Sequence, residues 1–516
     1  MALLAKAPNP FDMTAVGGTA PVVHSNRITK GTPQQEAVWD FLLNYDDNLV
    51  IEALAGTGKS TVSREAMHRL KAKYPNERIQ YTCFNKSIAD EFRPRCPAGV
   101  EVNTMHAFGL RALQRAMNPT IAKDKSYEVL SSIHGGDALK RWHRMAVVKL
   151  VSLAKNHAVG LQNEIKSEVT YANLEGICDT FDIDPNQGQT IDYAIKVLLG
   201  SIERSDVVDF DDMLWLPLIY RTKFPGCDRL FIDEAQDMNP VQHLLAERMN
   251  EDGQTIVVGD RNQAIYGFRG ADSRSMDTMT ERLGAHCLPL TVTFRCPQSH
   301  VRLAREIVSG YEAHESNPEG VLAYGGPHDL ERVQPGDHVL CRANAPLVSE
   351  CLGLIANGVK ATMRGRAIGQ QLESVVTKVN KFGEARTMSD FVSKLETYRI
   401  KEMTRLSAKE GVEDLIEQLT DRCNAVEAIA SSCSSPSEVF PAIGKLFSDT
   451  DPSGYVLFSS IHRAKGTEAR RVWLLDMPYA PPKPGVVTPE WLVTQRRNLS
   501  YVGLTRSLDT MSILAI

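Results

Sequence analysis

The sequence lacks several patterns that would assign it to a specialised class of protein. No apolar run approaches the ~20 residues of a membrane span, and the N-terminal residues lack the apolar core of a signal peptide. The ten cysteines are scattered without a Cys-x-x-Cys pair, so neither a zinc site nor a disulfide framework is predicted. The formal net charge is only −5, so no global basic field indicates a nucleic-acid partner. We therefore expect a soluble cytoplasmic protein with reduced thiols, no membrane partner and only a local groove for any nucleic acid.

Length and composition predict a globular chain of several domains. Hydrophobic residues make up 43% and charged residues 23% of the sequence. A chain of 516 residues exceeds a single hydrophobic core, and its length predicts about three or four domains.

A phosphate-binding loop is predicted at residues 53–60, ALAGTGKS. The apolar run before it, 49–51, is typical of a buried strand, and residues 61–70 place apolar side chains at helical spacing. A Gly-rich turn between a strand and a helix directs backbone N–H groups and the helix dipole at an anion. Lys59 adds a positive charge for the β- and γ-phosphates, and Ser60 offers a hydroxyl to Mg²⁺. Ala53 stands where the generic pattern has Gly.

Adjacent carboxylates at the end of another apolar strand fit the same chemistry. The run 229–236, RLFIDEAQ, carries Asp233 and Glu234. In a chain with a phosphate loop, Asp233 would hold Mg²⁺ and Glu234 would activate the attacking water. The next strand, 255–260, leads to Gln263, which we expect within reach of a γ-phosphate.

Polar side chains also follow two predicted strands, 79–84 and 100–106. These strands would end at the edge of the parallel sheet where ligands bind in open α/β folds. Capping of the strand ends is the simpler interpretation of these side chains, which are Asn85, Lys86, Thr104 and His106.

The order of strand and helix signals predicts an α/β chain with two sheets and two helical insertions. We expect a flexible tail over 1–28, then a first domain over 29–109 and 205–284 that contains a helical insertion over 110–204. A second sheet is predicted to begin near Pro289 with a strand over 290–295. It belongs to a second domain over 285–370 and 451–516, which contains a small helical insertion over 371–450.

Taken in order, these motifs resemble those of superfamily 1 DNA helicases of the UvrD, Rep and PcrA type. The resemblance runs from Thr32 to the C-terminus and is weakest over the two insertions. The segment 84–91, FNKSIADE, is most similar to the F-box DNA helicase branch, although no F-box segment is apparent. The resemblance implies two RecA-like motor domains, 1A and 2A, with an insertion 1B and a reduced insertion 2B.

The resemblance also implies a nucleotide site shared by the two motor domains. Gln34 would read adenine and Phe294 would stack on it, while Glu468, in the segment HRAKGTE, would face the ribose. The implied catalytic residues are Lys59, Glu234, Gln263, Arg295 and Arg506, the last two as arginine fingers. The implied Mg²⁺ ligands are Ser60 and Asp233. The loop residues around the phosphates are Ala55, Gly56, Thr57, Gly58, Lys59, Ser60 and Thr61, and Ala is usual at the first loop position in this family.

The segment 258–271, VGDRNQAIYGFRGA, matches the family motif that joins ATP to single-stranded DNA. Phe268 takes the place of an aromatic that stacks on a base, and Arg269 is the accompanying basic residue. Further implied DNA contacts are Asn85, Lys86, Thr104, His106, Tyr266, Arg342, Ser460 and His462. Cys83 stands where many relatives have an aromatic residue, and Phe84 follows one position later.

The implied activity is that of an ATP-dependent DNA helicase or single-stranded DNA translocase moving 3′ to 5′, with ATP and Mg²⁺ as cofactors. Its substrates would be single strands and single-strand–duplex junctions in replication, repair or recombination, and its partners single-strand-binding or replication proteins. Two alternatives stay open: a DNA-stimulated ATPase that strips proteins from DNA with little unwinding, and a non-motor ATP-dependent switch. A nuclease–helicase is disfavoured, because no acidic nuclease segment remains once the motifs are assigned.

Overall fold

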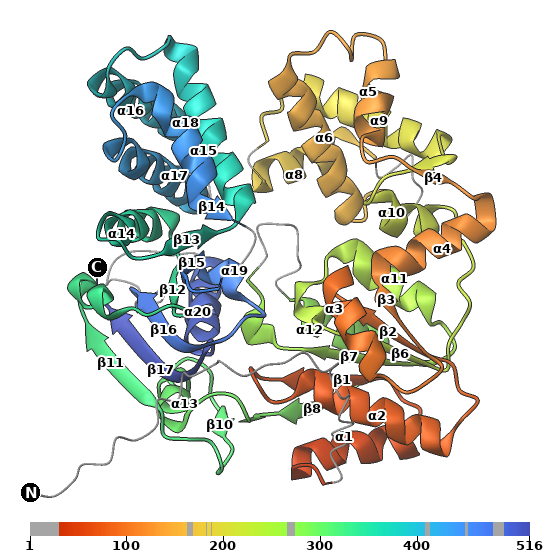
Figure 1. The fold of residues 1–516 in the computed structure, drawn as a ribbon. Coiled ribbons are helices and arrows are strands. Elements are labelled where there is room, and N and C mark those ends of the chain that lie inside the picture. The colour runs from red at the N-terminus through yellow and green to blue at the C-terminus, as the bar shows by residue number, and fades with distance from the viewer. Residues whose placement is uncertain are drawn as a thin grey trace, which may run out of the picture.

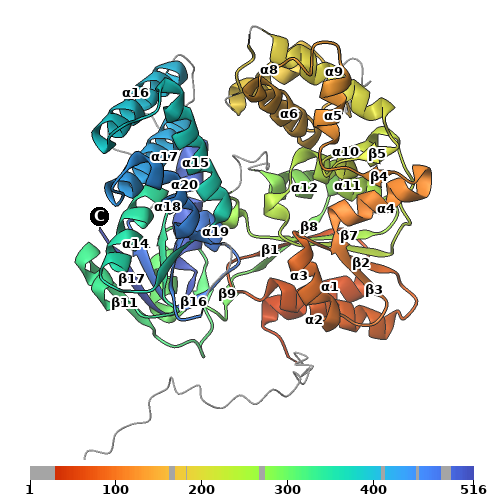
Figure 2. The same ribbon diagram turned by 45° about the horizontal axis from the view of Figure 1, so that its top comes forward.

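Two lobes make up the described part of the chain, and each is built around a parallel β-sheet (Figure 1). This computed structural model describes residues 30–161, 169–181, 183–186, 188–265, 274–407, 413–448, 453–477 and 490–515. The tail expected over 1–28 lies outside them. Each lobe carries a group of helices, and the two groups face each other at the same end of the molecule in both views (Figures 1 and 2). The predicted α/β class with two parallel sheets is confirmed.

The first sheet has six parallel strands in the order β3-β2-β6-β7-β1-β8. They are β1 (Leu49–Ala53), β2 (Ile79–Cys83), β3 (Val100–Thr104), β6 (Arg229–Ile232), β7 (Gln254–Gly259) and β8 (His286–Leu290). The central strands are buried, as their continuous apolar runs predict for a sheet covered on both faces. One face packs against α1 (Pro33–Asn44), α2 (Lys59–Lys73) and α3 (Lys86–Phe92). The other packs against α4 (Met105–Met117), α10 (Asp212–Ile219), α11 (Pro240–Met249) and α12 (Ser275–Leu283).

The first helical insertion shares its apolar core with this second face of the sheet. It contains α5 (Lys125–Ser132), α6 (Arg141–Asn156), α8 (Tyr171–Thr180) and α9 (Gln189–Glu203). A short parallel pair, β4 (Thr120–Ile121) and β5 (Val207–Val208), joins its entry to its exit.

The second sheet has seven parallel strands in the order β11-β17-β16-β12-β15-β13-β14. They are β11 (Val321–Gly325), β12 (His338–Cys341), β13 (Ala361–Arg364), β14 (Phe447–Ser448), β15 (Val456–Ser460), β16 (Ala469–Leu475) and β17 (Ser507–Leu514). The helices of this lobe include α13 (Gln298–Ala304), α14 (Asn344–Ala356), α19 (Ile461–Ala464) and α20 (Glu490–Leu504). The second insertion contains α15 (Arg366–Val379), α16 (Met388–Leu406), α17 (Glu413–Ser431) and α18 (Pro436–Leu446), and it shares one core with the sheet.

The strand expected over 290–295 as the start of the second sheet is wrong. Leu290 is the last residue of β8, which pairs with β1 at the edge of the first sheet. Pro289 is tolerated there because an edge strand has one side without ladder partners. The next strand, β9 (Val292–Thr293), pairs only with β10 (Glu312–Ala313) in a separate two-stranded sheet. The second sheet therefore begins at β11.

Four buried charges hold the first insertion onto its lobe. Lys125 Nζ lies 2.7 Å from Asp212 Oδ2, and Lys155 Nζ lies 2.7 Å from Asp212 Oδ1 and 3.0 Å from Asp209 Oδ2. Both lysine side chains are almost completely buried. The cluster joins α5, α6 and α10.

Within the described residues, no helix combines the length and the apolar character needed to cross a bilayer.

We predict that Asp212→Ala destabilises the protein by about 3 kcal/mol, because it leaves two buried ammonium groups short of their shared carboxylate. Calorimetric melting of the full chain would measure the effect as a lowered temperature of the unfolding transition. Asp206→Ala removes an exposed carboxylate from the same region and serves as the control. Equal melting curves for the two variants would contradict a stabilising role for the cluster.

Candidate active site

The predicted phosphate-binding loop joins the end of β1 to the start of α2. Gly56 and Gly58 have φ values of 70° and 88°, in the left-handed region that glycine adopts at little cost. Thr57 Oγ1 donates a hydrogen bond of 2.8 Å to the Leu54 carbonyl and closes the turn. The first N–H groups of α2 and its dipole therefore point toward a common anion position. The predicted residues Lys59, Ser60 and Thr61 form the first turn of this helix.

Carboxylates that follow β6 and β7 surround the Lys59 ammonium. Lys59 Nζ lies 3.3 Å from Glu234 Oε1. Burial by itself would lower the pKa of Lys59, but Glu234, Asp260 and Asp233 outweigh burial and raise it. Burial likewise opposes the charge of Glu234, yet Lys59 and Lys465 hold the pKa of this carboxyl well below its usual value. The pair is therefore fully ionised near neutral pH.

Asp233 is positioned by contacts that the sequence analysis missed. Tyr81 on β2 donates from Oη to Asp233 Oδ2 at 2.7 Å, and the Glu234 N–H donates to Oδ1 at 2.9 Å. Burial and the neighbouring Glu234 raise the pKa of Asp233 to about 6. Glu234 has a φ of 52°, rare for a residue other than glycine, and the Gln236 side chain donates to its carboxylate. Gln236 could have been noticed in the DEAQ string, but nothing local marks Tyr81.

Gln263 lies beside this cluster, in the turn η3 (Arg261–Gln263) that follows β7. Its Nε2 donates to Asp260 Oδ2 at 2.7 Å, and Asp260 acts on the charge of Lys59. The structure thus brings Gln263 beside the carboxylates around Lys59, and its contact with a γ-phosphate stays a prediction. Its amide would have to exchange the Asp260 bond to contact a phosphate.

Arg295 lies against the loop, and Arg506 of the second lobe lies close to Arg295. A Cβ added to Gly56 would lie 2.6 Å from Arg295 Cβ, so Arg295 packs directly against the loop. Its guanidinium forms an ion pair with Glu468. Arg506 is fully buried at the end of α20, where it donates to a backbone carbonyl at 2.8 Å and to Thr505 Oγ1 at 2.9 Å. Burial and then the neighbouring Arg295 lower the pKa of Arg506, because the two guanidinium groups are close together.

Gln34 and Phe294 flank the other side of the loop. Gln34 Nε2 donates to Thr291 Oγ1 at 2.9 Å, and the Thr291 N–H donates to Gln34 Oε1 at 2.8 Å. The Phe294 N–H donates to the Gly56 carbonyl at 2.9 Å, while its half-exposed ring stacks on His314 with centroids 4.7 Å apart. An amide next to an exposed ring is suited to bind a purine base. His314 was not identified from the sequence.

Two side chains of the second lobe hold the first lobe close, and both were missed. Lys465 Nζ donates to Asp237 Oδ2 at 2.6 Å and to the Gln263 carbonyl at 2.7 Å, with both charged side chains buried. Asn498 on α20 donates to the Ala264 carbonyl at 2.9 Å. Asp237 directly follows the DEAQ string and Lys465 lies inside HRAKGTE, but only the fold joins these segments.

Comparison with known proteins bears on this part of the chain. Residues 32–283, which contain the loop, the paired carboxylates and Gln263, match the family described as UvrD/REP helicase N-terminal domain. This stretch of the chain is similar to that domain. The predicted resemblance to superfamily 1 helicases is confirmed.

Similarity to curated relatives is distant and covers between 40% and 55% of this chain. The chain is 27% identical over 229 residues to ATP-dependent DNA helicase srs2 of Schizosaccharomyces pombe, which is 40% of this chain and 26% of that protein. It is 26% identical over 280 residues to F-box DNA helicase 1 of Gallus gallus, 52% of this chain and 26% of the relative. It is 24% identical over 320 residues to ATP-dependent DNA helicase PcrA of Bacillus subtilis, 55% of this chain and 40% of the relative. The matches thus span about a quarter to two fifths of the length of these relatives.

Two of the expected DNA contacts in the first lobe cap helices. Asn85 Oδ1 accepts the Ile88 N–H at 2.9 Å at the start of α3, and Thr104 Oγ1 accepts the Ala107 N–H at 3.2 Å at the start of α4. The capping interpretation of these two residues is therefore confirmed. Lys86 is exposed in the first turn of α3.

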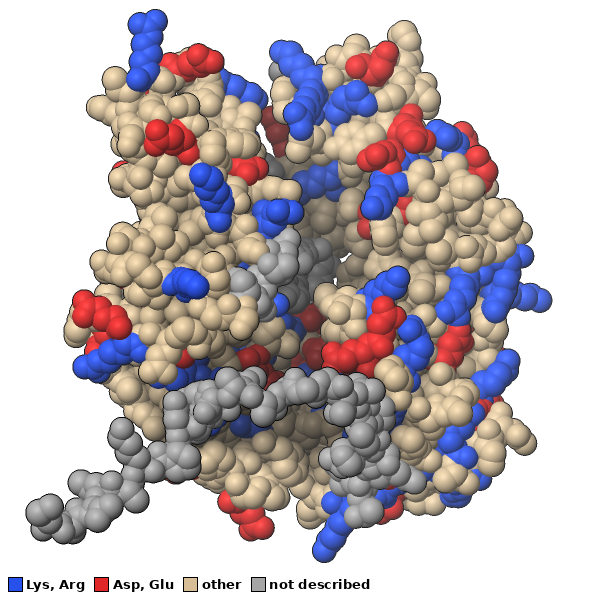
Figure 3. All heavy atoms as spheres, viewed as in Figure 1, with Lys and Arg blue, Asp and Glu red and all other residues tan. Residues whose placement is uncertain are grey.

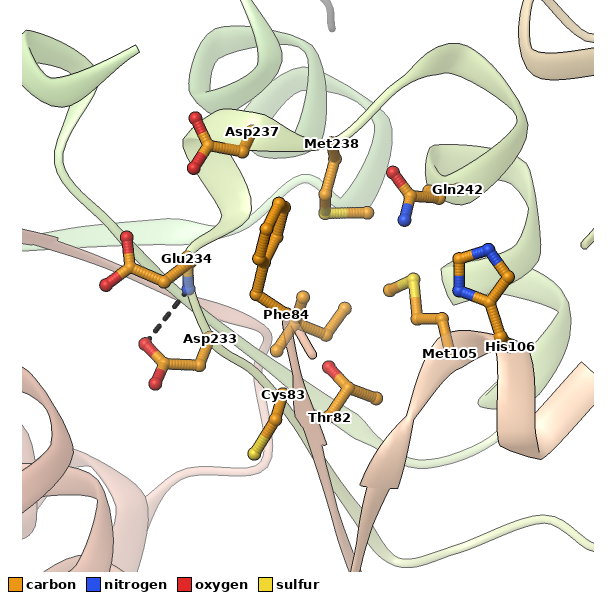
Figure 4. Close-up of a pocket in the computed structure, with 11 residues that line it drawn as sticks. Thr82, Cys83, Phe84, Met105, His106, Asp233, Glu234, Asp237, Met238 and Gln242 are labelled. Atoms are coloured by element: carbon orange, nitrogen blue, oxygen red, sulfur yellow. Dashed lines mark hydrogen bonds between the residues drawn. The ribbon is translucent and has the colours of Figure 1, made fainter. Parts of the chain in front are cut away.

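A hollow of the first lobe lies beside the paired carboxylates (Figure 4). The Phe84 ring stands between the side chains of Glu234 and Met238, and His106 faces it from the far wall. Burial lowers the pKa of His106, which favours the neutral imidazole. An aromatic ring, a thioether and a neutral imidazole give the wall a surface on which a nucleobase could stack.

The predicted DNA contacts of the second lobe lie near the carboxyl ends of the paired strands β12 and β15, where Cys341 is the register partner of Ser460. Arg342 forms an ion pair with Glu417 of α17, Ser460 is buried at the end of β15, and His462 is partly buried in α19. Three predicted contacts lie outside the described residues, namely Tyr266, Phe268 and Arg269.

We predict that Lys465→Ala loosens the contact between the lobes, because Asp237 would remain buried without its ammonium partner. Small-angle scattering should report a larger radius of gyration for the variant than for the unaltered protein. Lys394→Ala, which breaks an ion pair within α16, is the matched control. An unchanged radius in Lys465→Ala would show that this ion pair does not hold the lobes together.

Proposed function

We propose that the protein is an ATP-dependent DNA helicase or single-stranded DNA translocase. The observation that carries the proposal is that Arg295 packs against the loop that leads into Lys59. Arg506 lies close to Arg295, Glu234 pairs with Lys59, and Gln263 bonds to Asp260 beside them. The names of the relatives, all ATP-dependent or F-box DNA helicases, support ATP and DNA as the ligands.

The arrangement suits phosphoryl transfer, which needs positioned charge more than covalent chemistry. Lys59 and the two arginines would surround the γ-phosphate. When Lys59 turns to the phosphate, its ion pair with Glu234 is released, and that carboxylate becomes able to take a proton from water.

Asp233 and Ser60 would hold Mg²⁺. Asp233 fits this role because burial and Glu234 raise its pKa, which a neighbouring cation would reverse. A bound Mg²⁺ would supply charge neutralisation on the β- and γ-phosphates.

Closure of the lobes would couple hydrolysis to movement on DNA. The arginines complete the site only when the second lobe lies against the loop, so ATP stabilises the closed arrangement and hydrolysis releases it. Lys and Arg side chains line both rims of the hollow between the two insertions, where a phosphate backbone could lie (Figure 3). Stacking of a base on Phe268, roughly 1–3 kcal/mol, would bind DNA without sequence preference. The relatives of the UvrD type imply 3′-to-5′ movement.

The test is ATPase activity with and without single-stranded DNA, followed by unwinding of duplexes with 3′ or 5′ tails. Stimulation by DNA and unwinding of the 3′-tailed duplex alone would support the proposal. Displacement of streptavidin from a single strand without unwinding would instead favour a protein-stripping ATPase. ATP binding without DNA-stimulated hydrolysis would favour a switch protein.

We predict that Lys59→Ala abolishes ATP hydrolysis while the fold is kept, because the loop loses its charge for the β- and γ-phosphates. Phosphate release measured under saturating ATP checks the loss. Lys73→Ala, at the exposed end of the same helix, should retain the full rate. Turnover by Lys59→Ala would refute the assignment of the loop.

We predict that Arg506→Lys lowers the DNA-stimulated rate of ATP hydrolysis by about 10³-fold, because the shorter ammonium cannot span the position of the planar guanidinium. Binding of a fluorescent ATP analogue should change much less than the rate. Arg497→Lys, at an exposed position of the preceding helix α20, is the control. A rate within tenfold of the unaltered protein would exclude Arg506 as an arginine finger.

A further inference from the structure

The backbone of Ala55, in the phosphate-binding loop, is hydrogen-bonded entirely by the second lobe. The Ala55 N–H donates to Tyr501 Oη at 2.7 Å, and Tyr311 Oη donates to the Ala55 carbonyl at 2.8 Å. The N–H and the carbonyl of Ala55 are therefore both bonded to side chains that are distant in the sequence, 446 positions away for Tyr501 and 256 for Tyr311.

The two tyrosines belong to a fixed part of the second lobe. Both are fully buried, and their rings meet edge to face with centroids 5.6 Å apart. They lie in an apolar cluster that contains strands and helices of the second lobe together with Leu54 and Ala55 of the loop. Burial raises the pKa of both phenols well above the ordinary value, so both hydroxyls stay protonated.

Tyr501 also shares its helix with two other groups that reach the first lobe. Asn498, one turn earlier on α20, donates to the Ala264 carbonyl behind Gln263, and Arg506 follows the end of the helix. A movement of α20 therefore shifts three groups together: Tyr501 at the loop, Asn498 at the turn of Gln263, and Arg506.

We propose that Tyr311 and Tyr501 form a hydroxyl clamp through which closure of the second lobe fixes the conformation of the phosphate-binding loop. In the closed arrangement the clamp holds Ala55 and orders the loop for the triphosphate. When the lobes part, both Ala55 groups exchange the tyrosines for water, and the loop loosens around the nucleotide. The tyrosines are positioning residues, because they act on the phosphates only through the loop.

The clamp adds a positioning role to the proposed ATPase. Of its tests, only the measurement of the KM for ATP rests on the proposed function. Tyr→Phe removes one oxygen atom and keeps the ring, so the apolar cluster is retained. For each of Tyr311→Phe and Tyr501→Phe we expect the KM for ATP to rise about threefold to tenfold, because one hydrogen bond to the loop is lost. The kcat should change less. Tyr398→Phe removes the hydroxyl of a buried tyrosine in the second insertion and is the matched control.

Two measurements on the full chain need no hydrolysis. Hydrogen exchange at the Ala55 amide should accelerate in Tyr501→Phe and stay unchanged in Tyr398→Phe. The distance between dyes placed at the exposed Glu91 and Glu331, one in each lobe, should shift toward longer values in the Tyr311→Phe/Tyr501→Phe double variant.

The outcomes separate the clamp from the proposed function. Absence of ATP hydrolysis in the unaltered protein would overturn the ATPase, and the exchange and distance measurements would still decide on the clamp. Unchanged exchange at Ala55 in Tyr501→Phe would overturn the clamp even if ATP is hydrolysed. A longer distance between the dyes with an unchanged KM would also overturn it, because the tyrosines would then join the lobes without acting on the loop.

Discussion

The carboxyl ends of the strands in the first sheet fall at one edge, because every neighbouring pair is parallel. This constraint concentrates Lys59, Asp233, Glu234 and Asp260 within a few ångströms, in a place where burial opposes each charge. The charges are tolerable only together, since Lys59 stabilises the carboxylates that in turn stabilise it. A site of this kind is ready for an anionic ligand with a bound cation, because such a pair adds charge of both signs at once.

In this structure the cations at and near the cluster are paired with carboxylates of the protein. Arg295 is paired with Glu468, and Lys465 with Asp237, just as Lys59 is paired with Glu234. A triphosphate has to compete with Glu234 and Glu468 for their cations, and each exchange would release a carboxylate beside the phosphates. Binding of a triphosphate would therefore be weaker than the count of cations indicates, but the release of Glu234 would free the carboxylate proposed to take a proton from water.

The parts of this site that the sequence predicted are those in which the interacting residues are close together in the chain. The loop, the strand before it and the carboxylate pair are each short continuous segments. Their sequence patterns were therefore sufficient to identify them. The contacts of Tyr81 with Asp233 and of Lys465 with Asp237 join distant segments, and only the folded chain reveals them. The edge strand β8 was assigned to the wrong sheet because Pro289 interrupts its pattern and the next strand follows after one residue. The pairing of Arg342 with Glu417 was missed for another reason, since an acidic residue in a polar helix has no sequence mark for its partner.

The attachment of the second insertion decides what closure can move. Asp421 on α17 accepts the backbone N–H groups of Asn344 and Ala345 at the start of α14, each at 2.8 Å. Glu417, one turn earlier, pairs with Arg342 and with Arg496 of α20. Because the insertion and the second sheet also share one apolar core, separating them would expose that core and leave both carboxylates without partners. The insertion and the second lobe therefore move as one body. If closure carries Arg506 toward the loop, as the proposed function requires, the same rotation would carry the insertion toward its counterpart on the first lobe and change the width of the hollow between the insertions.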